Sequence, residues 1–163
     1  VMAWEYFHDD DVPQILEHIQ DRDLWQFKLE GTKDITTAIR LYPEWRDWLD
    51  LDTQALRLQG ASINAFMSQQ SDVILNTGPR LWEKTGDIVP LYNLPGFMIS
   101  DTLHMALEKY QECDYAVAYF DLPDKRVYSL RSRSGGDVDV SRIAKIFGGG
   151  GHKHAAGFTV DKD

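Results

Sequence analysis

Residues 148–158 read Gly148-Gly149-Gly150-Gly151-His152-Lys153-His154-Ala155-Ala156-Gly157-Phe158. Four consecutive glycines can turn their N–H groups to one side, because glycine adopts backbone conformations closed to other residues. We expect a helix to begin at the last glycine, with its positive end directed at the same point. His152 and Lys153 would then lie in its first turn and could add a hydrogen bond and a charge. The stretch predicts an anion-binding loop; the alternative is that the glycines serve only packing or oligomerisation.

Length and composition indicate a soluble globular chain. Of the 163 residues, 43% are apolar and 26% are charged, as in folded domains. The longest apolar runs, such as Tyr115 to Phe120, are far shorter than the roughly 20 residues that a membrane-spanning helix needs. Residues 1–5 lack the features of a secretory signal, and the single Cys113 has no partner for an intrachain disulfide. We therefore expect a cytoplasmic protein with no membrane partner.

The charge of the chain is unevenly distributed. The net charge is −9, and residues 1–124 carry 9 basic and 22 acidic side chains. Residues 125–153 carry 7 basic and only 2 acidic side chains. A local basic patch on an acidic body suits a small anionic ligand better than a long nucleic-acid duplex.

The pattern of apolar residues divides the chain into three segments. Residues 1–52 show short helical patterns, and the five tryptophans of the chain are expected to fill the core. Residues 53–78 read as one connecting helix, because apolar residues recur at heptad-like spacing until Thr77-Gly78-Pro79 ends it. Residues 79–163 mix strand and helix patterns. The predicted fold class is α/β, with a helical N-terminal segment, a long connecting helix and a small mixed β-sheet domain flanked by helices.

The third segment alternates between the two periodicities. Two β-rich runs separated by Leu122-Pro123-Asp124-Lys125 should pair as a hairpin, because this is a good turn sequence. The predicted elements are a strand over 88–94, a helix over 101–110 capped by Ser100, the hairpin strands 115–120 and 126–130, a helix over 140–147 and a strand over 158–160.

An arginine near the end of the second hairpin strand is a candidate ligand for a phosphate. Alternation along Ser129-Leu130-Arg131-Ser132 places Leu130 and Ser132 on one face and Ser129 and Arg131 on the other. Arg131 could reach into a cleft and bind a phosphate with two parallel hydrogen bonds. The alternative is an ordinary solvent-exposed arginine.

A pair of aspartates near the N-terminus is a candidate metal site. Asp21 and Asp23 lie two residues apart in Glu17-His18-Ile19-Gln20-Asp21-Arg22-Asp23-Leu24-Trp25. Their oxygens could hold a hard divalent cation such as manganese or magnesium at a helix end. The alternative is a pair of solvent-exposed acids with Arg22 as a counter-ion.

The glycine stretch resembles the signature of the DHH phosphoesterase superfamily, in its C-terminal DHH-associated substrate-binding domain. In that family an Arg-Ser pair precedes the glycine motif, and both line the nucleotide or phosphate pocket. The matching positions for substrate binding are Arg131, Ser132, Gly149, Gly150, Gly151 and His152. The stretch Asp21-Arg22-Asp23-Leu24-Trp25 resembles the fourth metal-binding motif of the oligoribonuclease and cyclic-nucleotide phosphodiesterase branch, which makes Asp21 the first choice for a metal ligand and Asp23 the second.

The resemblance implies an enzyme that hydrolyses short oligoribonucleotides or related nucleotides with two Mn²⁺ ions. The Asp-His-His triplet that names the family is absent from these 163 residues. We therefore expect a C-terminal fragment, whose partner is the missing upstream catalytic half, and which binds nucleotides without cutting them. The alternative is a non-catalytic nucleic-acid-binding module, as in RecJ-type exonucleases or alanyl-tRNA synthetases. A homodimer is left open.

Overall fold

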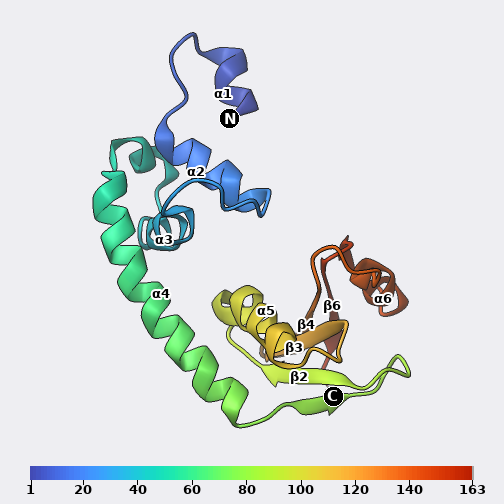
Figure 1. Cartoon of the computed structure of the whole chain (residues 1–163). Coiled ribbons are helices and arrows are strands. Elements are labelled where there is room, and N and C mark those ends of the chain that lie inside the picture. The colour runs from blue at the N-terminus through green and yellow to red at the C-terminus, as the bar shows by residue number, and fades with distance from the viewer. Residues whose placement is uncertain (163) are drawn as a thin grey trace. The chain divides into compact units, whose positions relative to one another are not determined.

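The computed structural model describes residues 1–162 and divides the chain into two compact units, Val1–Gln69 and Gln70–Asp163. The 24-residue helix α4 (Thr53–Asn76) passes through the boundary between them (Figure 1). This confirms the helix that the sequence predicts after residue 52. No helix within residues 1–162 is both long and apolar enough to cross a lipid bilayer.

The first unit is helical, as expected. Besides the start of α4 it contains α1 (Met2–Phe7), α2 (Gln14–Asp23), α3 (Thr32–Ala38) and two 3₁₀ helices over Ile39–Leu41 and Trp45–Asp50. Its core is formed by Ile15 of α2, Ile35 of α3 and Leu56 of α4, with their buried neighbours. Gly60 allows α4 to pass directly against α3, because a Cβ atom at this position would collide with the Asp34 carbonyl.

The tryptophans do not all fill the core. Trp82 is 3% exposed, but Trp25 is 46% and Trp45 is 61% exposed. The prediction is wrong for these two residues. Trp25 lies in the loop after α2 and has a φ of 55°, a left-handed conformation that bulky residues rarely adopt.

The second unit is built on one six-stranded sheet. In spatial order its strands are β1 (Arg80–Trp82), β2 (Val89–Asn93), β3 (Tyr115–Asp121), β4 (Lys125–Ser132), β6 (Ala155–Asp161) and β5 (Gly150–His152). Strands β2 and β3 are parallel, and all other neighbours are antiparallel. The sheet is therefore mixed, and the predicted hairpin is β3–β4. Strand β1 was not predicted.

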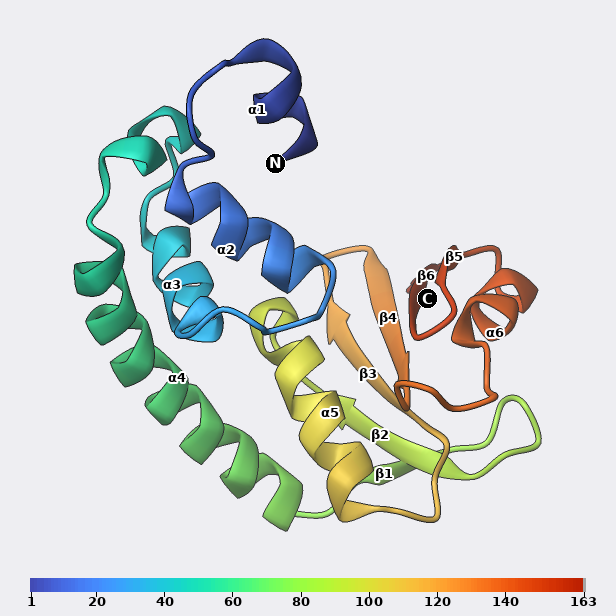
Figure 2. The ribbon, with the colours of Figure 1, turned by 45° about the horizontal axis from the view of Figure 1, so that its top comes forward.

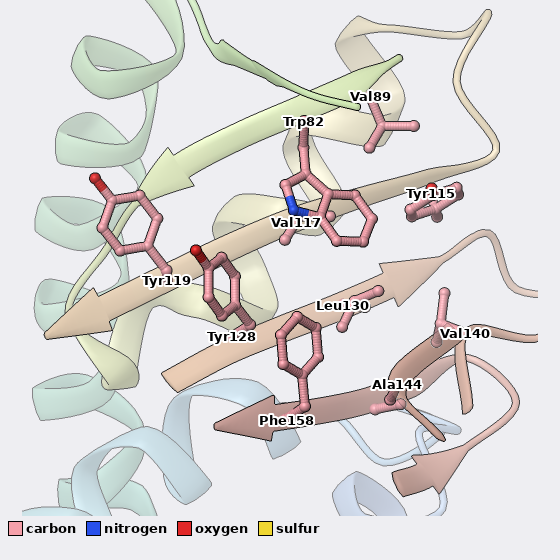
Figure 3. Packing of buried hydrophobic residues seen from close by; sticks show 11 residues of the cluster. Trp82, Val89, Tyr115, Val117, Tyr119, Tyr128, Leu130, Val140, Ala144 and Phe158 are labelled. Atoms are coloured by element: carbon pink, nitrogen blue, oxygen red, sulfur yellow. The ribbon is translucent and has the colours of Figure 1, made fainter. Parts of the chain in front are cut away.

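A helix packs on each face of this sheet. On one face, α5 (Ile99–Lys109) buries Leu103 and Ala106 against Ala116 and Ala118 of β3. The other face carries the larger side chains, and Figure 3 shows Val117, Leu130 and Phe158 among those of this cluster. Helix α6 (Val140–Ile146) covers part of that cluster with Val140 and Ala144. The α5 face also carries Tyr92 of β2 and Phe120 of β3, so it is small mainly at Ala116 and Ala118.

The sequence suggested that Ser100 caps α5, but the structure shows that it does not. The helix already begins at Ile99, after a 3₁₀ turn over Gly96–Met98. Ser100 therefore lies in the first turn, where its side chain is available to the neighbouring strand.

The prediction of a helix after the glycines is also wrong. Residues 150–161 form the hairpin β5–β6, so His152 ends a strand and Lys153 lies in the turn. Alanine favours helices, but propensity is a weak prior that tertiary pairing overrides. Here β6 pairs with β4 over seven residues, and Ala156 and Phe158 alternate into the core. Over residues 155–158 every second side chain is buried, which is the pattern of a strand and not of a helix.

Candidate functional site

The hairpin β5–β6 is positioned by its contacts with β4 and α6. Its two-residue turn is Lys153-His154. The Lys153 carbonyl accepts from the Val140 N–H at 2.9 Å, and the His154 carbonyl accepts from the Ser132 N–H at 3.3 Å. The turn is therefore fixed to the end of β4 and to the start of α6, which Figure 2 shows beside β5 and β6.

Three of the four consecutive glycines are required by the chain itself. Gly148 has a φ of 78° and Gly151 a φ of 141°, both in the region that favours glycine. A Cβ atom on Gly149 would collide with the carbonyl of Gly157. At Gly150, by contrast, φ is not positive, and a Cβ atom would meet no other part of the chain within 4 Å. The protein's own packing does not explain the glycine at position 150.

The strand register brings Arg131 and the glycine segment onto one face of the sheet. Arg131 lies opposite Ala155 of β6, which in turn lies opposite His152 of β5. In the next row, Ser129 lies opposite Gly157, which lies opposite Gly150. Paired residues project to the same face of an antiparallel sheet. In these two rows the β6 residues between β4 and β5, Ala155 and Gly157, thus have almost no side chain.

These small residues leave a hollow of about 530 Å³ on the face of the sheet that α5 partly covers. Its lining includes Arg131, Ser129 and all four glycines of the run. The structure thus brings together four of the predicted substrate-binding residues, Arg131, Gly149, Gly150 and Gly151. The complete lining is Val127, Tyr128, Ser129, Arg131, residues 148–151 and residues 155–159.

Arg131 is the charged group of the hollow. One guanidinium nitrogen, Nη2, donates to Ser100 Oγ at 3.0 Å, and Nη1 donates to the Leu130 carbonyl at 3.0 Å. Burial lowers the pKa of Arg131, but an arginine stays protonated in proteins. Within residues 1–162 no carboxylate lies at ion-pair distance from it. A partly buried cation without a counter-ion is costly and favours binding of an anion.

Two other arginines of the basic segment, Arg126 and Arg133, have partners in the protein. Arg126 forms an ion pair with Asp121, with Nε donating to Oδ1 at 2.6 Å. Arg133 donates to the Leu107, Tyr110 and Cys113 carbonyls at the end of α5, at 2.6 to 3.2 Å. Of the three arginines on and just after β4, Arg131 is therefore the one left for an anionic ligand.

Ser132 and His152 are placed differently from the rest of the predicted set. Ser132 is buried on the opposite face, where its hydroxyl lies 3.0 Å from the Val138 carbonyl and 2.9 Å from His154 Nδ1. A carbonyl can only accept, so Ser132 donates to it and can accept from the His154 ring. Ser132 thus fixes the hairpin turn. His152 is exposed at the end of β5 and is not part of the lining.

Sequence reasoning missed two side chains that support the site. Ser100 was read as a helix cap, although it bonds Arg131, because its partner is 31 residues away in the sequence. His154 stands in the quoted glycine stretch, but no sequence pattern indicates its contact with Ser132. Both contacts depend on the pairing of distant segments.

In the first unit, Asp21 is a buried residue that holds a loop together. Its Oδ1 accepts from the Lys28 N–H at 2.9 Å, and its Oδ2 accepts from the Leu29 N–H at 3.0 Å and the Thr32 hydroxyl at 2.6 Å. Burial tends to raise the pKa of Asp21, but the hydrogen bonds from Thr32, Lys28 and Leu29 outweigh it and lower this pKa. The carboxylate is thus charged and satisfied by the loop.

His18 extends this arrangement. Its Nδ1 lies 2.9 Å from Thr32 Oγ1, whose single proton goes to Asp21. The Thr32 hydroxyl must therefore accept from the ring, which places the imidazole proton on Nδ1. Burial lowers the pKa of His18, and the charges of Asp21 and Glu17 offset part of this effect.

Asp21 and Asp23 do not converge on one point. Asp23 is exposed, whereas Asp21 is buried in the loop. Among residues 1–162, no group of three or more His, Cys, Asp or Glu side chains is placed to hold a metal ion. Residues 1–162 therefore do not assemble a two-metal centre by themselves, and the assignment of Asp21 or Asp23 as a metal ligand stays a prediction.

Comparisons with known proteins agree with this architecture. A family model described as the DHHA1 domain matches residues 99–163, the part that contains α5, β3–β6 and the hollow. The uncharacterized protein R106 of Acanthamoeba polyphaga mimivirus is 33% identical over 176 residues. The alignment covers 97% of this chain but only 40% of R106. The chain thus spans well under half the length of this relative.

Two solved structures are similar to this chain. One is described as the DHH domain of a member of a family of ribosomal proteins, with a TM-score of 0.51 and 16% identity. It is matched over 90% of this chain and 41% of its own length. The other is a pGpG-specific phosphodiesterase, PggH, from Vibrio cholerae, with a TM-score of 0.48 and 9% identity over 98% of this chain and 66% of its own. The first likeness shows a shared fold.

Proposed function

Because the chain belongs to the DHH superfamily through its DHHA1 domain at residues 99–163, we propose that it is the nucleotide-binding, C-terminal portion of a phosphoesterase. The observation that carries the proposal is the pairing of Arg131 with the glycine hairpin. Arg131 is a partly buried cation without a counter-ion, and it lines the same hollow as Gly150. The ligand that meets both conditions is an anion that approaches the backbone closely.

The geometry favours a phosphate group at the end of a nucleotide. A planar guanidinium can bind two phosphate oxygens at once, whereas a lysine offers a single charged point. The hollow of about 530 Å³ is in the range of sites for small molecules. One unpaired arginine is too few for a long nucleic acid, whose binding requires several contacts with phosphates. We therefore propose a short oligoribonucleotide or a related nucleotide as substrate.

Hydrolysis itself requires groups that residues 1–162 do not bring together. In this proposal two Mn²⁺ ions would be held by other parts of a longer protein, and they would supply the charge that activates a water molecule. The residues of this chain bind and orient the nucleotide end. His152 would contribute from the row that also contains Arg131, across the small side chain of Ala155.

Binding of adenosine 5′-monophosphate to the chain, measured by NMR titration, tests the proposed pocket. We expect binding with chemical-shift changes in β4, β5 and β6. Arg131→Ala should weaken it at least 10-fold, because a charge-assisted contact is lost. Arg126→Ala is the matched control, since Arg126 is paired with Asp121 on the same strand and its loss should leave affinity unchanged. Equal effects of both variants would reject the pocket.

An activity assay separates binding from cleavage. With Mn²⁺ and a short oligoribonucleotide, we expect no turnover by this chain and turnover by the full-length relative R106. Hydrolysis by this chain, abolished by Asp21→Asn, would contradict the proposed division of labour. Affinity that rises steadily with RNA length would instead indicate a nucleic-acid-binding module.

A further inference from the structure

Two hydroxyls of the hollow, those of Ser129 and Thr159, have no assigned role, and Ser129 is the one in the row of Gly150. Ser129 lies on β4 two residues before Arg131, on the same face, and lines the hollow. Within residues 1–162 no group accepts from or donates to its side chain. The buried serines of the second unit are all bonded: Ser71 to Thr102, Ser132 to Val138 and Ser141 to Asp139. Ser129, which is half-buried and faces the hollow, has no such partner within residues 1–162.

The cross-strand neighbours of Ser129 carry no charge. Its neighbours across the sheet are Ala118 on β3 and Gly157 on β6, and Gly150 on β5 follows in the same row. None of these residues has a polar side chain. A ligand group at this position would therefore be neutral and polar, because a second phosphate would find no cation there.

The distance from Arg131 suggests which group this is. Residues two apart on a strand are separated by roughly 7 Å along the sheet. This is about the reach from a phosphate to the sugar that carries it. A Cβ atom on Gly150 would meet no other part of the chain within 4 Å, and Gly157 carries no side chain, so this row leaves room for a sugar ring.

We propose that the Ser129 hydroxyl binds a ribose hydroxyl of the nucleotide whose phosphate Arg131 holds. The hollow then distinguishes ribonucleotides from deoxyribonucleotides. This inference rests on the proposed function and extends it to the sugar. Ser129 is a specificity-determining residue, and Arg131 supplies the affinity for the phosphate.

Three probes that differ in one hydroxyl test the inference. They are adenosine 5′-monophosphate and its 2′-deoxy and 3′-deoxy analogues, titrated into the chain by NMR. For the unaltered protein we expect one deoxy analogue to bind about 3- to 10-fold more weakly, the range of one net hydrogen bond. Ser129→Ala should weaken the binding of adenosine 5′-monophosphate by the same factor. It should leave unchanged the affinity for the weaker-binding deoxy analogue. Ser68→Ala, on an exposed position of α4, is the matched control.

The outcomes separate this inference from the proposed function. Equal binding of all three probes by the unaltered protein, or the same discrimination after Ser129→Ala, would overturn the role of Ser129 while the phosphate pocket stands. An equal loss for all three probes in Ser129→Ala would also overturn it, since the effect would not depend on a sugar hydroxyl. If the unaltered protein binds none of the probes, the phosphate pocket is rejected and the inference falls with it.

Discussion

Gly149 lies so close to Gly157 that a Cβ atom on Gly149 would overlap the Gly157 carbonyl oxygen. This approach fixes the segment between α6 and β5 against β6. The next residue, Gly150, has open space where its Cβ would be. Two adjacent glycines are thus present for different reasons, one for packing and the other, in our proposal, for a ligand.

Alanine at these two positions should therefore have opposite effects. We expect Gly149→Ala to lower the free energy of unfolding by about 1–3 kcal/mol, because the methyl group forces the strands apart. Gly150→Ala should change it by less than about 0.5 kcal/mol and should weaken binding of adenosine 5′-monophosphate, because its methyl group enters the hollow. Urea unfolding and NMR titration measure the two quantities. A Gly150→Ala protein that binds normally would show that no ligand approaches this backbone.

Arg131→Lys tests whether the geometry of the guanidinium matters beyond its charge. A lysine keeps the positive charge but cannot bind two phosphate oxygens in parallel or retain the same bond to Ser100. We expect affinity for adenosine 5′-monophosphate to fall on the order of 10-fold, as for a lost charge-assisted hydrogen bond. Ser100→Ala should give a smaller loss, because it only frees the guanidinium. Unchanged affinity of the lysine variant would indicate a purely electrostatic contact.

Arg133 stabilises the second unit through the end of α5. Its guanidinium donates to three carbonyls, those of Leu107, Tyr110 and Cys113. Arg133→Ala leaves these half-buried acceptors without their donor, and we expect a loss of about 2 kcal/mol in the free energy of unfolding. Hydrogen exchange of the α5 amides should increase. Lys145→Ala on the exposed side of α6 is the control, and an equal loss there would contradict this role.

The stability of the first unit should depend on pH through His18. Burial lowers its pKa in the folded protein, whereas an unfolded histidine titrates near about 6.5. As the pH falls through this value, the unfolded chain takes up a proton that the folded chain resists, so stability is lost. Urea midpoints at pH 7.5 and pH 5.5 should differ more for the unaltered protein than for His18→Gln. The same difference in both proteins would show that His18 is not responsible.

Asp21 should make the stability of the first unit depend on pH in a lower range than His18 does. Its pKa is lowered in the folded state, so its contribution to stability is present above the ordinary carboxylate pKa and is lost as the pH falls through the folded value. Asp21→Asn should weaken the loop already at neutral pH, because an amide nitrogen would face the Lys28 or Leu29 N–H. Increased exchange of these two amides is the measurement; unchanged exchange would contradict it.

Several elements could be predicted because their signals are local. The Leu122-Pro123-Asp124-Lys125 turn indicates the β3–β4 hairpin, and apolar spacing indicates α4. The segment after the glycines was misread, because Ala155 and Ala156 favour a helix until β4 offers them a partner strand. Similarly, the family resemblance placed Ser132 and Arg131 in one substrate-binding set, although strand alternation already puts their side chains on opposite faces of the sheet.

By itself, the amino-acid sequence determined the helical and strand-rich halves and the position of the long helix, and it singled out Arg131 and the glycines as candidates for an anion site. Tertiary structure alone decided that Arg131 of β4 has no counter-ion, and that Gly149 packs against β6 whereas Gly150 lies against open space. These properties depend on strand pairing between β4, β6 and β5, which joins residues far apart in the chain. Local periodicity reports which face a side chain occupies, but only packing shows what it meets there.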